Sequence, residues 1–107
     1  MKEIITMREY QIRSIECFIL PKPVYFQCIW LIRDLERLNA APSHIAESRA
    51  RIAAVEAALN FIPKDYRKGI MENIIDRTPY PDIAHENTWK KWKQRFIYEL
   101  AINLDLI

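Results

Sequence analysis

The chain has 107 residues, half of them apolar, with 16 basic residues against 14 acidic ones. This length and composition allow one domain with a sizeable core, and the near balance of charge says little about partners by itself. Glycine occurs once, which argues against a sheet protein with many tight turns and predicts an all-α fold of about five helices.

The N-terminal segment predicts a helix over residues 6–18, because Thr6 and Glu9 have the spacing of a capping box. Pro21 and Pro23 end this helix and divide the apolar run around them, so neither part reaches the ~20 residues of a membrane span. The first ten residues are also too polar for a secretory signal. We therefore expect a cytoplasmic protein with no membrane partner.

Cys17 and Cys28 both have apolar neighbours. Buried free thiols in a reducing compartment explain them better than a disulfide does. The spacing of Cys and His fits no metal site, and the sequence has no Gly-rich phosphate loop or paired-carboxylate motif. We therefore expect no enzyme activity, no cofactor and no metal.

A second helix is expected over about residues 24–38, and its first half is apolar on all sides. Such a helix is buried from several directions, either within the monomer or at a contact with a second chain. Both alternatives remain open from the sequence, and the second predicts a homodimer. The residues of this oligomer or partner interface would be Tyr25, Phe26, Ile29 and Trp30.

A short loop leads to a third helix over about residues 44–61, with Ser43 as its expected N-cap. Short connections pack consecutive helices antiparallel, so the second and third helices should form a hairpin. Residues 1–61 would then be the oligomerisation half of a single domain, and residues 62–107 the other half. The apolar stripe of the third helix consists of Ile45, Ile52, Val55, Leu59 and Ile62.

Pro63 begins a fourth helix, Lys64–Asp76, in which Gly69 costs about 1 kcal/mol relative to Ala. Close packing against the last helix is one reason to keep a glycine there. Residues 77–81 predict a turn, and residues 82–85 allow one helical turn at most, with an extended link over residues 79–85 as the alternative. The last helix is expected to start near Asn87 as its N-cap and to run to about Leu104.

The last helix carries the densest basic cluster of the chain, with four cations and no acidic residue between positions 87 and 98. Basic helix faces are usually only solvated, and charge alone favours that explanation over DNA binding. At about 100° per residue the helix has an apolar face and an opposite polar face. The apolar face consists of Trp89, Trp92, Phe96 and Leu100, and the polar face of Lys91, Gln94, Arg95 and Tyr98, with Lys90 on the flank.

A helix, a turn and a basic helix follow one another from Ile62 onward, as in helix-turn-helix proteins. In that arrangement the amino end of the last helix enters the major groove, where Lys and Arg reach phosphates or guanine. Asn87 and Gln94 are suited to reading adenine, and Arg77 and Thr78 in the turn are suited to holding the DNA backbone.

Residues 61–101 resemble small phage and prophage transcriptional regulators of Gram-positive bacteria, of the RinA and ArpU type, whose C-terminal part is similar to region four of bacterial sigma factors. The matching residues are 62–63, 65–69, 79–81, 88–89 and 93–98, and residues 24–38 look like the upstream helix of such proteins. The resemblance implies a sequence-specific regulator that binds double-stranded DNA. It gives recognition-helix roles to Asn87, Thr88, Lys90, Lys91, Gln94 and Arg95. The alternative is an interaction module that binds RNA polymerase or another phage protein without touching DNA.

Overall fold

The computed structural model describes residues 18–107. The capping pair Thr6 and Glu9 and the thiol of Cys17 lie outside the described residues, as does the helix predicted for residues 6–18 apart from its last residue. Within residues 18–107 the predicted all-α class is confirmed. The elements are α2 (Lys22–Arg33), α3 (Leu35–Ala40), the 3-10 turn η2 (Pro42–His44), α4 (Ile45–Leu59), α5 (Lys64–Asp76) and α6 (Glu86–Asn103).

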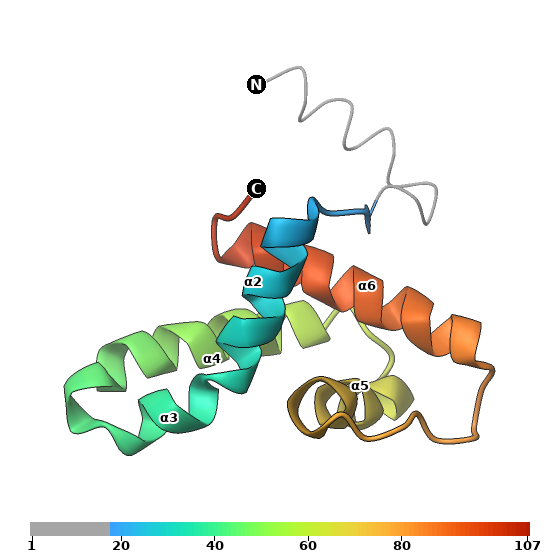
Figure 1. Ribbon diagram of the computed structural model, residues 1–107, viewed down its shortest axis with the longest axis horizontal. Coiled ribbons are helices and arrows are strands. Elements are labelled where there is room, and N and C mark those ends of the chain that lie inside the picture. The colour runs from blue at the N-terminus through green and yellow to red at the C-terminus, as the bar shows by residue number, and fades with distance from the viewer. Residues whose placement is uncertain (1–17) are drawn as a thin grey trace.

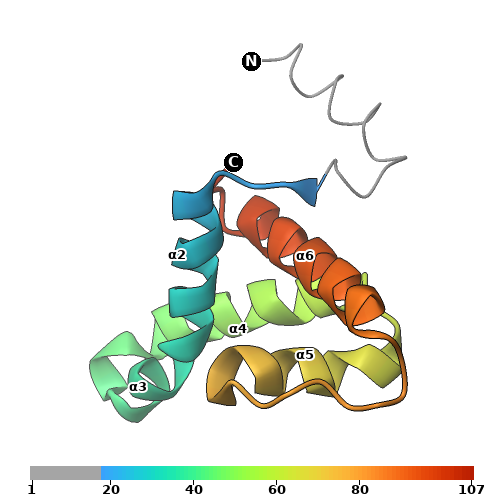
Figure 2. The same cartoon turned by 45° about the vertical axis from the view of Figure 1, so that its right-hand side comes forward.

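Helix α6 is the element around which the others pack, since it contacts α2, α4 and α5 (Figure 1). In the turned view α2 and α6 stand above α4 and α5 (Figure 2). The side chains of all four helices meet in one core, and burial of this apolar surface is the main stabilising contribution. The largest fully buried side chains include Trp89, Phe96, Ile32, Ile70 and Ile74.

The helix predicted for residues 24–38 is divided at Asp34 into α2 and α3. Asp34 keeps a near-helical backbone (φ −83°, ψ −5°), and its carboxylate accepts two hydrogen bonds from the Arg37 guanidinium at 2.6 and 2.7 Å. The division lets α2 run to α5 and α6 while α3 turns alongside α4. The predicted hairpin is therefore formed by α3 and the start of α4.

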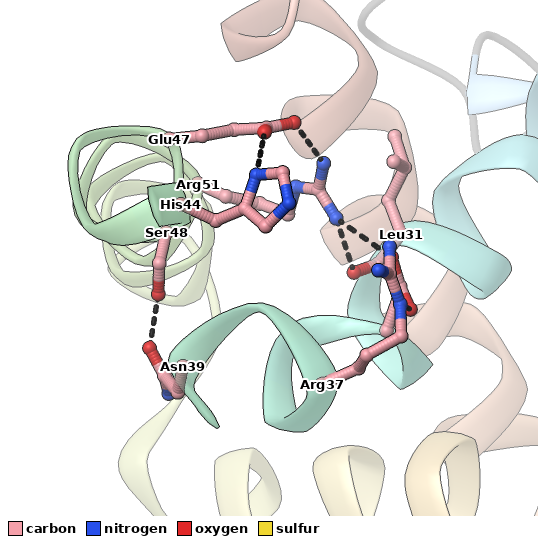
Figure 3. Close-up of polar contacts among 8 residues, drawn as sticks. Leu31, Arg37, Asn39, His44, Glu47, Ser48 and Arg51 are labelled. Carbon is pink, nitrogen blue, oxygen red and sulfur yellow. Dashed lines mark hydrogen bonds and ion pairs between the residues drawn. The ribbon is translucent and has the colours of Figure 1, made fainter. Parts of the chain in front are cut away.

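Polar contacts of Arg51 tie the start of α4 to the α2–α3 bend (Figure 3). Its guanidinium donates to the carbonyl of Leu31 at 3.4 Å and to the carboxylate of Glu47 at 2.9 Å, and it lies 3.7 Å from Asp34. The hydrogen bonds from Arg37 are the main cause that lowers the pKa of the Asp34 carboxyl. Close by, the buried Ser48 hydroxyl donates to the side-chain oxygen of Asn39.

Of the apolar stripe predicted for α4, the buried members lie in or just beyond the second half of the helix. Val55 is buried, and Ile62 just beyond the helix is buried too, whereas Ile45 is 46% exposed. The start of α4 extends beyond the other long helices and has only the short α3 and η2 beside it, so no core covers Ile45. Ser43 is not the N-cap of α4, because it lies inside η2, and His44 occupies the cap position.

Helix α5 has the predicted bounds, Lys64–Asp76. The prediction that Gly69 allows close packing of the last helix is confirmed, because a Cβ at this position would lie 2.7 Å from both Cη2 and Cζ3 of Trp89. The residues after α5 form an extended link with a turn at 82–83 rather than a one-turn helix. None of the helices described is long and apolar enough to cross a membrane.

Candidate nucleic-acid interface

The start of α6 is held in place by a cap and by aromatic contacts. His85, not Asn87 as predicted, is the N-cap: its Nδ1 accepts a hydrogen bond from the backbone N–H of Asn87 at 3.0 Å. Trp89 is fully buried, donates from Nε1 to the Pro81 carbonyl at 3.0 Å, and stacks on Tyr80 with ring centroids 5.4 Å apart. These contacts fix the direction of the first two turns relative to α5 and the link.

Three candidate DNA-binding residues are exposed on these first turns: Asn87, Lys90 and Lys91. The Lys90 ammonium lies 2.8 Å from the Glu86 carboxylate, in an ion pair whose two side chains are both more than 60% exposed. Such a pair contributes little stability and is screened by salt, so Lys90 can leave it at low cost. Lys91 lies 5.3 Å over the Trp92 ring, and among the described residues no carboxylate lies within ion-pair distance of it.

The other two cationic or amide candidates of α6 are engaged inside the protein. Gln94 donates from Nε2 to the Phe18 carbonyl at 2.9 Å. Arg95 pairs with Glu99 at 3.0 Å, and its guanidinium lies between the rings of Phe18 and Phe61 at 4.7 and 4.9 Å. The polar edge of α6 is therefore narrower than the sequence predicted, and Arg95 has the contacts of a structural residue.

The prediction that Tyr98 lies on the polar face is wrong. Tyr98 is 4% exposed, and its ring meets Phe18 edge-on with centroids 5.1 Å apart. The chain just before α2 crosses this side of α6 and covers it. Trp92, predicted to be inward, is only half-buried, while Trp89, Phe96 and Leu100 are buried as predicted.

Arg77 and Thr78 are exposed where the link begins after α5, and the link runs from there to the start of α6 (Figure 2). Arg77 caps α5 in the left-handed conformation (φ 58°), and the Thr78 carbonyl accepts a hydrogen bond from Asn73 Nδ2 at 2.9 Å. The structure thus places these two candidates away from the amino end of α6, where they do not extend its basic edge. Thr88 itself is half-buried.

A pocket of about 310 Å³ lies between the start of α2 and the first half of α6. This pocket could not be predicted from the sequence, because its lining residues come from segments that had been given separate roles or none. A tyrosine from each of two segments and two lysines from the first half of α6 line it. Its lining residues are Tyr25, Tyr80, Lys90, Lys93 and Gln94.

The predicted interface residues of α2 divide between core and surface. Ile29 is 6% exposed and belongs to the core, and Tyr25 is half-buried. Phe26 and Trp30 are 54% and 62% exposed. Trp30 also borders a shallow hollow of about 260 Å³ and lies 5.5 Å from the Arg33 guanidinium. Burial within the monomer thus accounts for one face of this helix, and the other face presents two large exposed aromatic side chains.

The thiol of Cys28 is fully buried and free, as predicted. It donates a weak hydrogen bond to the Ile97 carbonyl at 3.9 Å, and burial raises its pKa to about 11. A thiol with so high a pKa is a poor nucleophile and a poor metal ligand at neutral pH. Over residues 18–107 no cluster of three or more His, Cys, Asp or Glu side chains is placed to hold a metal ion.

No protein-family model, curated protein or solved structure matches this chain.

Proposed function

We propose that this protein is a phage-derived, sequence-specific regulator of transcription that contacts duplex DNA through the exposed edge at the start of α6. The supporting observation is that Asn87, Lys90 and Lys91 lie exposed on a helix end whose direction is fixed by the buried Trp89. Between residues 77 and 95 there are five basic residues and two acidic ones, so this region attracts a polyanion.

The roles of the three residues follow from their donors and their positions. Among residues 18–107 no carboxylate competes for Lys91, so this ammonium is suited to a phosphate contact. Lys90 would exchange Glu86 for a phosphate, because the solvent-exposed pair is weak. Asn87, at the amino end of the helix, has the paired donor and acceptor that read adenine in the major groove. Arg95 is left out of this set, since its guanidinium is committed to Glu99 and two rings.

The test is fluorescence anisotropy with a labelled duplex from the DNA that flanks the gene, at two salt concentrations. Lys91→Gln should weaken binding and reduce the slope of log affinity against log salt by about 1, the contribution of one phosphate contact. Lys68→Gln on α5, whose side chain is 86% exposed, is the matched control and should change little. If Lys91→Gln and Lys90→Gln behave like this control, the assignment to α6 is wrong.

A second candidate function, binding of a protein partner through the outer face of α2, is favoured by the exposure of Phe26 and Trp30. The partner we favour is a second copy of this chain, because aromatic side chains on a single helix face suit an isologous contact, and dimers match repeated DNA half-sites. Trp30→Glu should then lower the mass measured by sedimentation equilibrium to that of a monomer. Ile83→Glu, at a 64% exposed apolar residue of the link, is the control.

A strict monomer in the wild-type protein would exclude the homodimer. Capture of host RNA polymerase that is lost in Trp30→Glu would then assign the same face to the polymerase. If neither assembly nor capture responds to Trp30→Glu, this face has no partner-binding role.

A further inference from the structure

The pocket between α2 and α6 contains an unusual basic group. The Lys93 side chain is half-buried, and its ammonium donates to Asn73 Oδ1 at 2.9 Å. An ammonium group has three donors, so two remain for other partners. Within the part of the chain that the structure describes, no carboxylate lies within ion-pair distance of Lys93, and a buried charge without an opposite charge is costly.

The neighbours of Lys93 increase this cost. Burial, followed by the positive charge of Arg33, lowers the pKa of the Lys93 ammonium. Arg33 is itself turned to the end of α5, where it donates to the Ile74 carbonyl at 2.7 Å. Lys93 thus carries the cost of its burial and of a neighbouring cation, and an anion beside its ammonium would offset both the desolvation and the repulsion.

The remaining walls of the pocket supply hydrogen-bond donors. Tyr25 and Tyr80 contribute hydroxyl groups that lie near one another, and burial is the main cause that raises the pKa of each, so both stay protonated at neutral pH. Lys90 closes the α6 side of the pocket, and its partner Glu86 is the acidic group at this rim. Two phenols and two ammonium groups therefore line one opening.

We propose that this pocket binds the phosphate group of a small phosphate monoester, held by Lys93 and Lys90 and by the hydroxyls of Tyr25 and Tyr80. A phosphate monoester carries close to two negative charges at neutral pH and offers three acceptor oxygens. These properties match two ammonium groups and two hydroxyl donors. The volume of about 310 Å³ is at the lower end of small-molecule sites, which suits a phosphate with a small organic group.

The test is titration of the protein with phenyl phosphate and with inorganic phosphate at constant ionic strength, followed by phosphorus NMR. We expect one saturable site. Lys93→Gln should weaken it about tenfold or more, since a charge-assisted contact is lost, while Gln can still donate to Asn73. Lys93→Arg should retain binding, and Tyr80→Phe should weaken it about threefold while keeping the ring stacked on Trp89.

Two further variants separate a built site from diffuse charge. Lys68→Gln, which removes an exposed cation outside the pocket, should leave phosphate binding unchanged. Glu86→Gln should strengthen it, because Lys90 loses its competing partner. The proposal is overturned if the wild type shows no saturation, or if Lys93→Gln and Lys68→Gln have equal effects. Circular dichroism checks that each variant is folded. If Lys93→Gln is poorly folded, the phosphate affinities of Lys93→Arg and Tyr80→Phe decide the question.

A phosphate of the DNA backbone, a diester with one negative charge, is the competing phosphate ligand, and the duplex titration of the same variants distinguishes the two. If Lys93→Gln weakens phosphate binding alone, the ligand is a free ester. If it weakens both, the pocket takes a backbone phosphate. Lys91 lies outside the pocket. If neither Lys91→Gln nor Lys90→Gln affects duplex binding, the DNA proposal is refuted, while the phosphate titration of the Lys93 variants still tests the pocket proposal separately.

Discussion

Gly69→Ala tests the contact on which the position of α6 depends. The added Cβ would lie 2.7 Å from two ring carbons of Trp89 and 3.2 Å from Cδ of Pro81. Trp89 is fully buried and is held by its hydrogen bond to Pro81 and by the Tyr80 stack, so the ring cannot move away cheaply. Overpacking of this kind costs about 1–3 kcal/mol, and two rigid contacts at this distance indicate the upper end.

Helix propensity opposes this cost, because Ala is better than Gly within a helix by about 1 kcal/mol. The steric cost exceeds the propensity gain, and we expect a net destabilisation of about 2 kcal/mol. That corresponds to a fall in Tm of roughly 10 °C for a domain of this size. Urea denaturation followed by circular dichroism measures the change in the free energy of unfolding.

A double-mutant cycle shows whether Trp89 is the cause. Trp89→Phe removes the outer ring atoms that the methyl group would meet, so Gly69→Ala in that background should be neutral or stabilising by up to about 1 kcal/mol. If Gly69→Ala alone stabilises the protein, as at an exposed helix position, then Trp89 does not lie against Gly69 and the packing of α5 on α6 is not as described.

Two further predictions concern titratable groups. Because burial raises the pKa of the Cys28 thiol, the unfolded state releases this proton at a lower pH than the folded state. The contribution of the thiol to the free energy of unfolding is therefore fully present below about pH 9 and is lost between about pH 9 and pH 11. Iodoacetamide labelling of a Cys17→Ser variant should be slow until the protein unfolds, and rapid labelling at pH 8 would contradict the burial. The pKa of the Asp34 carboxyl is lowered, mainly by its hydrogen bonds from Arg37. The ionised carboxylate therefore stabilises the folded state at any pH above the ordinary carboxyl pKa, and this stabilisation is lost as the pH falls through the lowered pKa. The Tm of Asp34→Asn should therefore lie below that of the wild type at neutral pH and approach it in acid; an unchanged difference would contradict the role of Asp34.

Local sequence signals were sufficient for α5. Pro63, the apolar spacing and the end of the pattern at Asp76 predicted its bounds, and the unfavourable glycine pointed to the close approach of the last helix. The N-cap of α6 was predicted two residues too late, at Asn87 instead of His85, because an imidazole acts as the cap where Ser, Thr, Asp or Asn is usual.

Three features could not be predicted from the sequence because they depend on contacts between residues far apart in the chain: the burial of Tyr98, the bend at Asp34 and the pocket at Lys93. Tyr98 is buried because Phe18, 80 positions earlier, lies against it, and helical periodicity contains no information about a second covering segment. The bend at Asp34 has neither Pro nor Gly, and instead coincides with its hydrogen bonds from Arg37 and the approach of Arg51 from α4. For the same reason the pocket at Lys93 was missed, since its walls come from α2, the link and α6.

The first half of α6 carries the proposed DNA contacts and the second half packs in the core, so few side chains of this helix are available to contact DNA. From Arg95 onward the helix is committed to the core and to internal pairs, so Asn87, Lys90 and Lys91 remain for the groove. Known groove-reading elements place about 3–4 side chains at base edges, and two of these three are better suited to phosphates. One copy therefore has too few contacts for sequence discrimination, and a second copy joined through Phe26 and Trp30 would double them. The exposed face of α2 and the basic edge of α6 then act together in DNA recognition. Trp30→Glu should reduce the preference for the specific duplex over random duplex, without changing the salt dependence of binding per protein chain. An unchanged preference would mean that one copy reads the site alone.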